Sequence, residues 1–172
     1  MAEPFKNFFN PEMIHMMGLH LGRQWSEFDQ QRFIQLATEN FEQLELKQRA
    51  SQISQALAQC LPEHLPRALE VMVSALHPEE GVDLSGTHMD EQGIRGWAIM
   101  PMADLVASQG LAEWVAESGT SNQQLFEACM HTLKQMTKRF SAEFAIRPFI
   151  EAEPERTLSY LNDWAKDDNY HV

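Results

Sequence analysis

The sequence lacks the long apolar runs, cysteine pairs and basic leader of membrane, disulfide-rich and secreted proteins. No run of about 18 apolar residues occurs, so no membrane-spanning helix is predicted. The opening Met-Ala-Glu-Pro-Phe-Lys lacks the basic stretch and apolar core of a secretory signal. Only two cysteines occur, Cys60 and Cys129, and both fall within apolar helical patterns. We therefore expect both to be reduced core residues of a cytoplasmic protein rather than a disulfide.

Recognisable metal and cofactor motifs are also missing. The seven histidines include no pair spaced three or four residues apart, and neither a glycine-rich phosphate loop nor a Ser or Cys nucleophile motif occurs. The tightest cluster of potential metal ligands is His88, Asp90 and Glu91, in a polar loop predicted at 77–96. We therefore predict no metal and no cofactor, with a metal-dependent protein that uses this loop cluster as a weaker alternative.

No stretch of the sequence alternates apolar and polar residues for long enough to indicate a strand. Apolar residues instead recur at spacings of three and four, as on one face of a helix. The clearest stripes lie at 46–61 and 65–76, with Pro62 between them. Two antiparallel helices joined by a short turn are the repeating unit of HEAT-like solenoids. The sequence predicts an all-α fold of stacked antiparallel helix pairs in a single domain over 1–172, with a generic globular α-domain as the alternative.

Prolines mark the expected helix boundaries in the second half of the chain. We predict a helix at 97–106 that Pro101 disturbs, and a separate short helix at 111–116. A further helix is predicted at 141–147, and Pro148 is expected to kink or restart it.

Positive charge is scarce, and the net charge is −12. Residues 61–129 hold two Lys and Arg against eleven Asp and Glu, whereas 1–60 hold five against seven and 130–172 hold six against seven. Phosphates repel carboxylates, and binding to nucleic acid depends on cations that displace counterions. The charge pattern therefore disfavours contact with nucleic acid across the middle of the chain and permits it at either end.

Two patterns in the last third allow both a structural and a functional interpretation. Phe140 and Phe144 share one predicted helix face, while Glu143 and Arg147 share another. The pair is either a surface ion pair over an aromatic core stripe, or a carboxylate held by a guanidinium at the rim of a groove, placed to stabilise a cationic partner. Trp164 is either a core residue or an exposed ring that can pack on a sugar or base.

Residues 136–149 (MTKRFSAEFAIRPF) and 164–172 (WAKDDNYHV) resemble the two signature segments of AlkC-type DNA alkylation repair proteins. Residues 46–53 (LKQRASQI) and 96–102 (GWAIMPM) resemble earlier parts of the same family. The resemblance covers most of the chain, and the last third is its most specific part.

The resemblance implies HEAT-like repeats curved around duplex DNA, and a DNA glycosylase that needs neither metal nor cofactor. It would remove cationic N-alkylated bases such as 3-methyladenine and 3-methylcytosine, with double-stranded DNA that contains alkylated bases as its partner. Departure of such a base leaves an oxocarbenium-like sugar, and a fixed carboxylate stabilises that transition state. We expect a monomer without membrane contact.

The resemblance also assigns roles to residues of this chain. Glu143 lies in the matching Ser-Ala-Glu-Phe segment and is the leading catalytic candidate, with Asp168 as the second carboxylate. Arg147 would hold Glu143 or a phosphate, and Trp164 would pack near the lesion. Three basic residues are predicted phosphate contacts from their charge and position: Lys138, Arg139 and Lys166.

Members of the family usually continue past the segment that matches His171 and Val172 with an arginine-rich stretch and further repeats. We therefore expect the chain to correspond to the N-terminal portion of such a protein, as a truncated form or a natural short relative. Glycosylase activity is accordingly expected of the full-length protein. The acidic middle and the missing basic stretch favour the alternative, a non-catalytic helical-repeat module that binds DNA or a protein partner.

Overall fold

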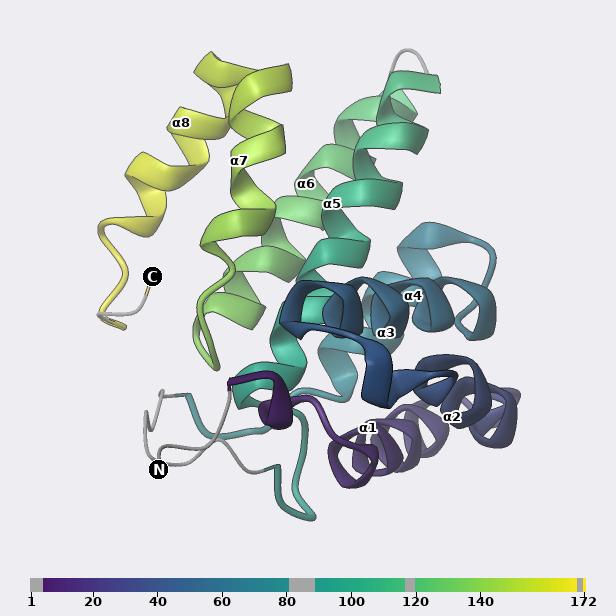
Figure 1. Ribbon diagram of the computed structural model, residues 1–172. Coiled ribbons are helices and arrows are strands. Elements are labelled where there is room, and N and C mark those ends of the chain that lie inside the picture. Colours follow the sequence, from purple (N-terminus) through teal and green to yellow (C-terminus); the bar gives the residue numbers. More distant parts are fainter. Residues whose placement is uncertain (1–4, 81–88, 117–119, 170–171) are drawn as a thin grey trace.

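A computed structural model of the protein describes residues 5–80, 89–116, 120–169 and 172, which fold almost entirely into helices (Figure 1). The described part contains two isolated β-bridges and no strand. Among the described residues, no helix has the length and apolar character needed to cross a membrane. The α-helices in chain order are α1 (Pro11–Gln24), α2 (Gln30–Thr38), α3 (Leu46–Cys60), α4 (Leu65–Ser74), α5 (Ile99–Ala116), α6 (Thr120–Thr137), α7 (Glu143–Ala152) and α8 (Pro154–Trp164).

The α-helices stack in two rows, as in a helical-repeat protein. In the first row α2 packs on α3, α3 on α5 and α5 on α7, and in the second row α1 packs on α4 and α4 on α6. The last helix, α8, packs on α7 and joins the second row through Tyr160, whose ring lies 6.0 Å from that of Phe126 in α6. In Figure 1, α4 and α6 lie behind α3 and α5. The predicted all-α helical-repeat fold is confirmed.

Side chains that satisfy free backbone N–H groups determine where helices begin. Asn10 precedes α1, and its Oδ1 accepts a hydrogen bond of 2.9 Å from the Met13 amide. At the start of α3, Glu45 and Gln48 form a reciprocal capping box, in which the Glu45 amide donates to Gln48 Oε1 at 2.9 Å. Such caps replace hydrogen bonds that the first turn of a helix cannot make internally.

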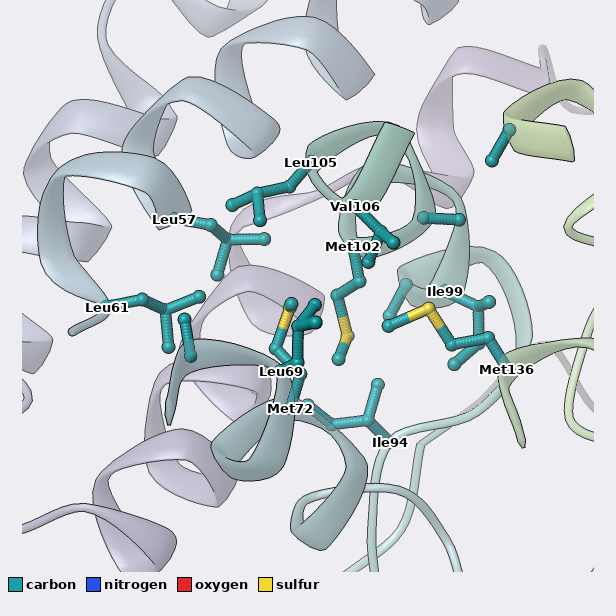
Figure 2. Packing of buried hydrophobic residues seen from close by; sticks show 14 of the residues in the cluster. Leu57, Leu61, Leu69, Met72, Ile94, Ile99, Met102, Leu105, Val106 and Met136 are labelled. Carbon is teal, nitrogen blue, oxygen red and sulfur yellow. The ribbon is translucent and has the colours of Figure 1, made fainter. Parts of the chain in front are cut away.

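The central helix is α5, which contacts α3, α4, α6 and α7. Up to Gly110 its buried residues lie on nearly every side, while residues 111–116 are half-buried or exposed. Figure 2 shows apolar side chains of α3, α4, α5 and α6 in the core around it, among them Leu57, Met72, Met102 and Met136.

The cysteine prediction is confirmed, because Cys60 and Cys129 are both free and buried. Burial raises the pKa of the Cys129 thiol to about 12, as expected of an inert core residue.

The prediction for Pro101 was wrong. Residues 99–116 form one continuous helix, because Pro101 lies in its first turn, where a backbone N–H has no partner within the helix. Pro148 lies inside α7 (Glu143–Ala152), so of its two predicted effects the restart of the helix does not occur.

Close packing of α5 on α6 depends on the absence of a side chain at Gly110. A Cβ at this position would lie 2.6 Å from Cys129 Sγ and 3.6 Å from Phe149 Cζ. Cys129 and Phe149 are fully buried, so neither has free volume into which to move.

We predict that Gly110→Ala lowers the free energy of unfolding by about 1–3 kcal/mol through overpacking, measured by urea denaturation. Gly22→Ala in α1 is the matched control, because nothing lies within 4 Å of its added Cβ. Removal of the opposing sulfur by Cys129→Ala should reduce the cost of the Gly110 substitution. An equal cost in both backgrounds would contradict this account.

Candidate functional site

Glu143 and Arg147 form an exposed ion pair on the first turns of α7. Arg147 Nη2 donates a hydrogen bond to Glu143 Oε1, one helical turn earlier. The side chain of Glu143 is 65% exposed and that of Arg147 is 58% exposed. Glu143 is the first residue of α7, where the helix macrodipole favours a carboxylate. The predicted pairing is present, and the carboxylate is both oriented and open to a ligand.

The expected aromatic stripe of Phe140 and Phe144 was wrong. Phe140 lies in the turn between α6 and α7 and packs on Trp97, with 5.2 Å between the ring centroids. Phe144 lies in α7 and is 61% exposed, with the Arg147 guanidinium 4.8 Å from its ring centroid. Helix α6 ends at Thr137 and α7 begins at Glu143, so Phe140 and Phe144 do not share a helix face.

A groove of about 530 Å³ is lined by residues of α3, α5 and α7. Asp104 of α5 is a half-buried carboxylate in its lining, and Phe144 borders it from α7. Burial raises the pKa of the Asp104 carboxyl. Asp104 was not predicted from the sequence, although a charged residue between the apolar stretches 99–103 and 105–107 was a usable signal.

Trp164 is a core residue. It is 4% exposed and belongs to the buried apolar cluster, so its ring has no open face for a base. This position agrees with the structural interpretation of Trp164 and does not support its predicted packing near a lesion. Asp168 lies four residues beyond Trp164 and is exposed.

Arg139 is 8% exposed and holds the backbone of distant segments. Its Nε donates to the His77 carbonyl at 2.8 Å and its Nη1 to the Gln135 carbonyl at 3.0 Å. These contacts tie the end of α6 to the segment after α4, so this geometry does not support the predicted phosphate contact of Arg139.

Lys138 takes part in a cluster of ion pairs that holds the segment after α8. Lys134 Nζ lies 2.7 Å from Asp167 Oδ2, and Lys138 Nζ lies 3.0 Å from Glu80 Oε1 and 3.9 Å from Asp167 Oδ2. The hydrogen bond from Lys134 holds the pKa of Asp167 below its usual value. Lys166 is 67% exposed and forms an ion pair with Asp163, three residues earlier.

The loop cluster weighed as a metal site is only partly described. His88 lies outside the described residues, while Asp90 Oδ2 lies 3.0 Å from Arg95 Nη2 and 3.3 Å from His77 Nε2. No group of three or more His, Cys, Asp and Glu residues within the described segments is arranged to hold a metal ion.

Comparison with known proteins gives a relative for nearly the whole chain. The structure matches that of Pseudomonas fluorescens alkylpurine DNA glycosylase AlkC, bound to DNA containing an abasic site analog, with a TM-score of 0.76 and 26% identity. The match covers 99% of this chain and 41% of AlkC. The predicted resemblance to AlkC is confirmed.

A second relative is the uncharacterized protein YhaZ of Bacillus subtilis (strain 168). It is 27% identical to this chain over 168 residues, which are 97% of this chain and 40% of YhaZ. No family model matches the sequence. The chain thus spans about two fifths of AlkC and of YhaZ, and it carries the AlkC-like fold within that part.

We predict that the Lys134–Asp167 ion pair contributes more stability at neutral pH than in acid. Because folding lowers the pKa of Asp167, the contribution is fully present above the unfolded pKa of about 3.9 and is lost as pH falls through the folded value. Lys134→Met should therefore lower the melting temperature by more at pH 7 than at pH 2.5.

Lys166→Met, at an exposed position, is the control for the loss of a positive charge. Thermal unfolding followed by circular dichroism measures all three proteins at both pH values. An equal loss at pH 2.5 would mean that Lys134 acts through the packing of its aliphatic stem.

Proposed function

We propose that this chain belongs to a DNA alkylation repair protein that excises cationic N-alkylated bases, of the 3-methyladenine and 3-methylcytosine type, from double-stranded DNA. The observation that carries the proposal is the match of nearly the whole chain to AlkC, an alkylpurine DNA glycosylase bound to abasic DNA. An abasic site is what remains when a glycosylase has removed a base. The activity is proposed for a protein of the length of AlkC, of which this chain spans 41%.

The chemistry of the reaction requires a carboxylate near the sugar. Alkylation places a positive charge on the base, so the glycosidic C–N bond breaks with its electron pair moving onto the base, which leaves uncharged. The sugar becomes oxocarbenium-like, and water then adds to its C1′ and releases a proton. A fixed carboxylate stabilises the positive sugar and can accept that proton.

Glu143 fits this role by its position. Its side chain is exposed at the start of α7, and Arg147 fixes its orientation through the ion pair. A preoriented charge acts on the transition state without reorganising during the reaction, which is the source of its effect. Arg147 would be a positioning residue for Glu143 or would bind a phosphate.

Of the other predicted site residues, the proposal keeps those whose side chains are accessible. Asp168 is an exposed second carboxylate, and Lys166 is an exposed cation that can approach a phosphate. The proposal omits Trp164 and Arg139 because their side chains are buried. It omits Lys138 because its ammonium group is paired with Glu80.

A non-catalytic module that binds DNA or a protein is the second candidate. The net charge of −12 favours it, as does the pairing of Lys134 and Lys138 with acidic residues, since paired cations contribute less to phosphate binding. The non-catalytic module would release no base, and its binding to DNA or to a protein would not depend on the Glu143 carboxylate.

We predict that Glu143→Gln lowers the rate of base release about 100- to 1,000-fold while DNA affinity changes little. The amide keeps the size of the side chain and removes the charge that the transition state needs. Release of 3-methyladenine and 3-methylcytosine from methylated duplex DNA, measured by chromatography under single-turnover conditions, tests the chain and the complete protein.

Glu151→Gln is the matched control, because Glu151 is an exposed carboxylate on the same helix. No release by the complete protein would refute the glycosylase function. Release that Glu143→Gln leaves unchanged would instead refute the assignment of Glu143 and retain the activity.

A further inference from the structure

Arg147 contacts two consecutive residues on the first turns of α7. Its Nη2 donates a hydrogen bond to Glu143 Oε1, and its guanidinium carbon lies 4.8 Å from the centroid of the Phe144 ring. Side chains of a helix lean towards its N-terminus, so an arginine three and four residues further along reaches back over both positions. The guanidinium is therefore held by a carboxylate and by an aromatic ring at the same time.

The ring of Phe144 differs from the other rings on which an arginine lies in the described part of the chain. Arg49 lies 4.4 Å from the ring centroid of Phe41, which is buried. Arg156 lies 4.4 Å from the ring centroid of Phe126, which is also buried. Phe144 is instead 61% exposed. Its contact with an arginine is therefore not a by-product of core packing.

An exposed ion pair by itself holds its two side chains only weakly. The side chains of Glu143 and Arg147 are both more than half exposed, so water screens their attraction, and an ordered arginine loses much rotamer freedom. A cation over the face of an aromatic ring gains a further attraction, and the planar guanidinium stacks well on such a ring. The Phe144 ring therefore restricts Arg147 to conformations from which its Nη2 reaches Glu143.

The contact holds one oxygen of Glu143 and leaves the other open. Within the described segments Oε1 accepts the hydrogen bond from Arg147, and no hydrogen bond reaches Oε2. A carboxylate held through one oxygen presents the other in a defined direction, as electrostatic stabilisation of a transition state requires. Movement of Arg147 would lose this direction while the charge of Glu143 remained.

We infer that Phe144 is a positioning residue of the glycosylase reaction, because its ring holds the Arg147 guanidinium that orients the Glu143 carboxylate. The inference rests on the proposed function, which assigns the stabilisation of the sugar to Glu143. Phe144 itself would contact neither the base nor the sugar. Its ring should therefore act on the rate of base release and not on the affinity for DNA.

The test uses Phe144→Leu, which keeps an apolar side chain and removes the aromatic face. Single-turnover release of 3-methyladenine should become about two- to fivefold slower, the factor that corresponds to an exposed cation–π contact. The Kd for duplex DNA should stay unchanged. Both are measured in a protein of the length of AlkC that contains this chain.

Two further variants separate the aromatic contact from a general effect of the substitution. Phe144→Tyr keeps the aromatic face and should restore the rate of release. Leu158→Ala alters another exposed apolar side chain, on α8, and is the matched control that should leave both the rate and the Kd unchanged. In a double-mutant cycle, Phe144→Leu should slow release no further once Arg147→Met has removed the guanidinium.

A measurement on the free 172-residue chain tests the contact without catalysis. The ¹⁵N relaxation of the Arg147 Nε–Hε group gives an order parameter, which reports how tightly the side chain is held. This order parameter should fall in Phe144→Leu and be restored in Phe144→Tyr. An order parameter that Phe144→Leu leaves unchanged would overturn the inference.

The kinetic outcomes distinguish failure of the inference from failure of the proposed function. Release at full rate by Phe144→Leu would overturn the inference and retain the glycosylase. A rise in Kd by the same factor as the loss of rate, or an undiminished effect in the Arg147→Met background, would also overturn it, because Phe144 would then contact the DNA directly. No release by the unaltered protein would refute the proposed function, and the inference with it.

Discussion

The contact of α5 with α6 at Gly110 and Cys129 is the constraint on which the two-row arrangement depends. The missing side chain at Gly110 lets the Cys129 sulfur and the Phe149 ring approach the α5 backbone, so helices from both rows meet at one point. Because α5 also packs on α3 and α4, a shift of α5 away from α6 would disturb its contacts with these helices as well. Close-packed interiors transmit such strain because they contain few voids to absorb it.

The same central helix lines the groove. In the first row α5 lies between α3 and α7, and its polar residues Asp104 and Ser108 line the groove beside these neighbours. Phe144 lines the groove from α7, one residue after Glu143. Side chains on packed helices are held more accurately than side chains on loops, which suits a reaction that depends on a positioned charge.

Local patterns predicted much of the helical structure, and long-range contacts explain what they missed. The stripes at 46–61 and 65–76 became α3 and α4 because amphipathic periodicity follows directly from one-sided burial. Helix α5 was predicted in two pieces, since a helix enclosed on nearly all sides has little periodicity to detect. Charge alone predicted phosphate contacts at Lys138 and Arg139, yet their partners, Glu80 and His77, lie about 60 residues away in sequence and were invisible to local reasoning.

The candidate site contains two carboxylates in opposite environments, and that difference is informative. Glu143 is exposed, paired with Arg147 and placed at a helix start, so its charge is oriented without a loss of stability. Asp104 is half-buried, and within the described part of the chain no hydrogen bond or ion pair reaches its carboxylate, so burial raises its pKa by disfavouring the charged form. A charge that is fixed in advance suits a transition state, because its effect does not depend on a conformational change. Environment rather than residue type therefore separates the two carboxylates.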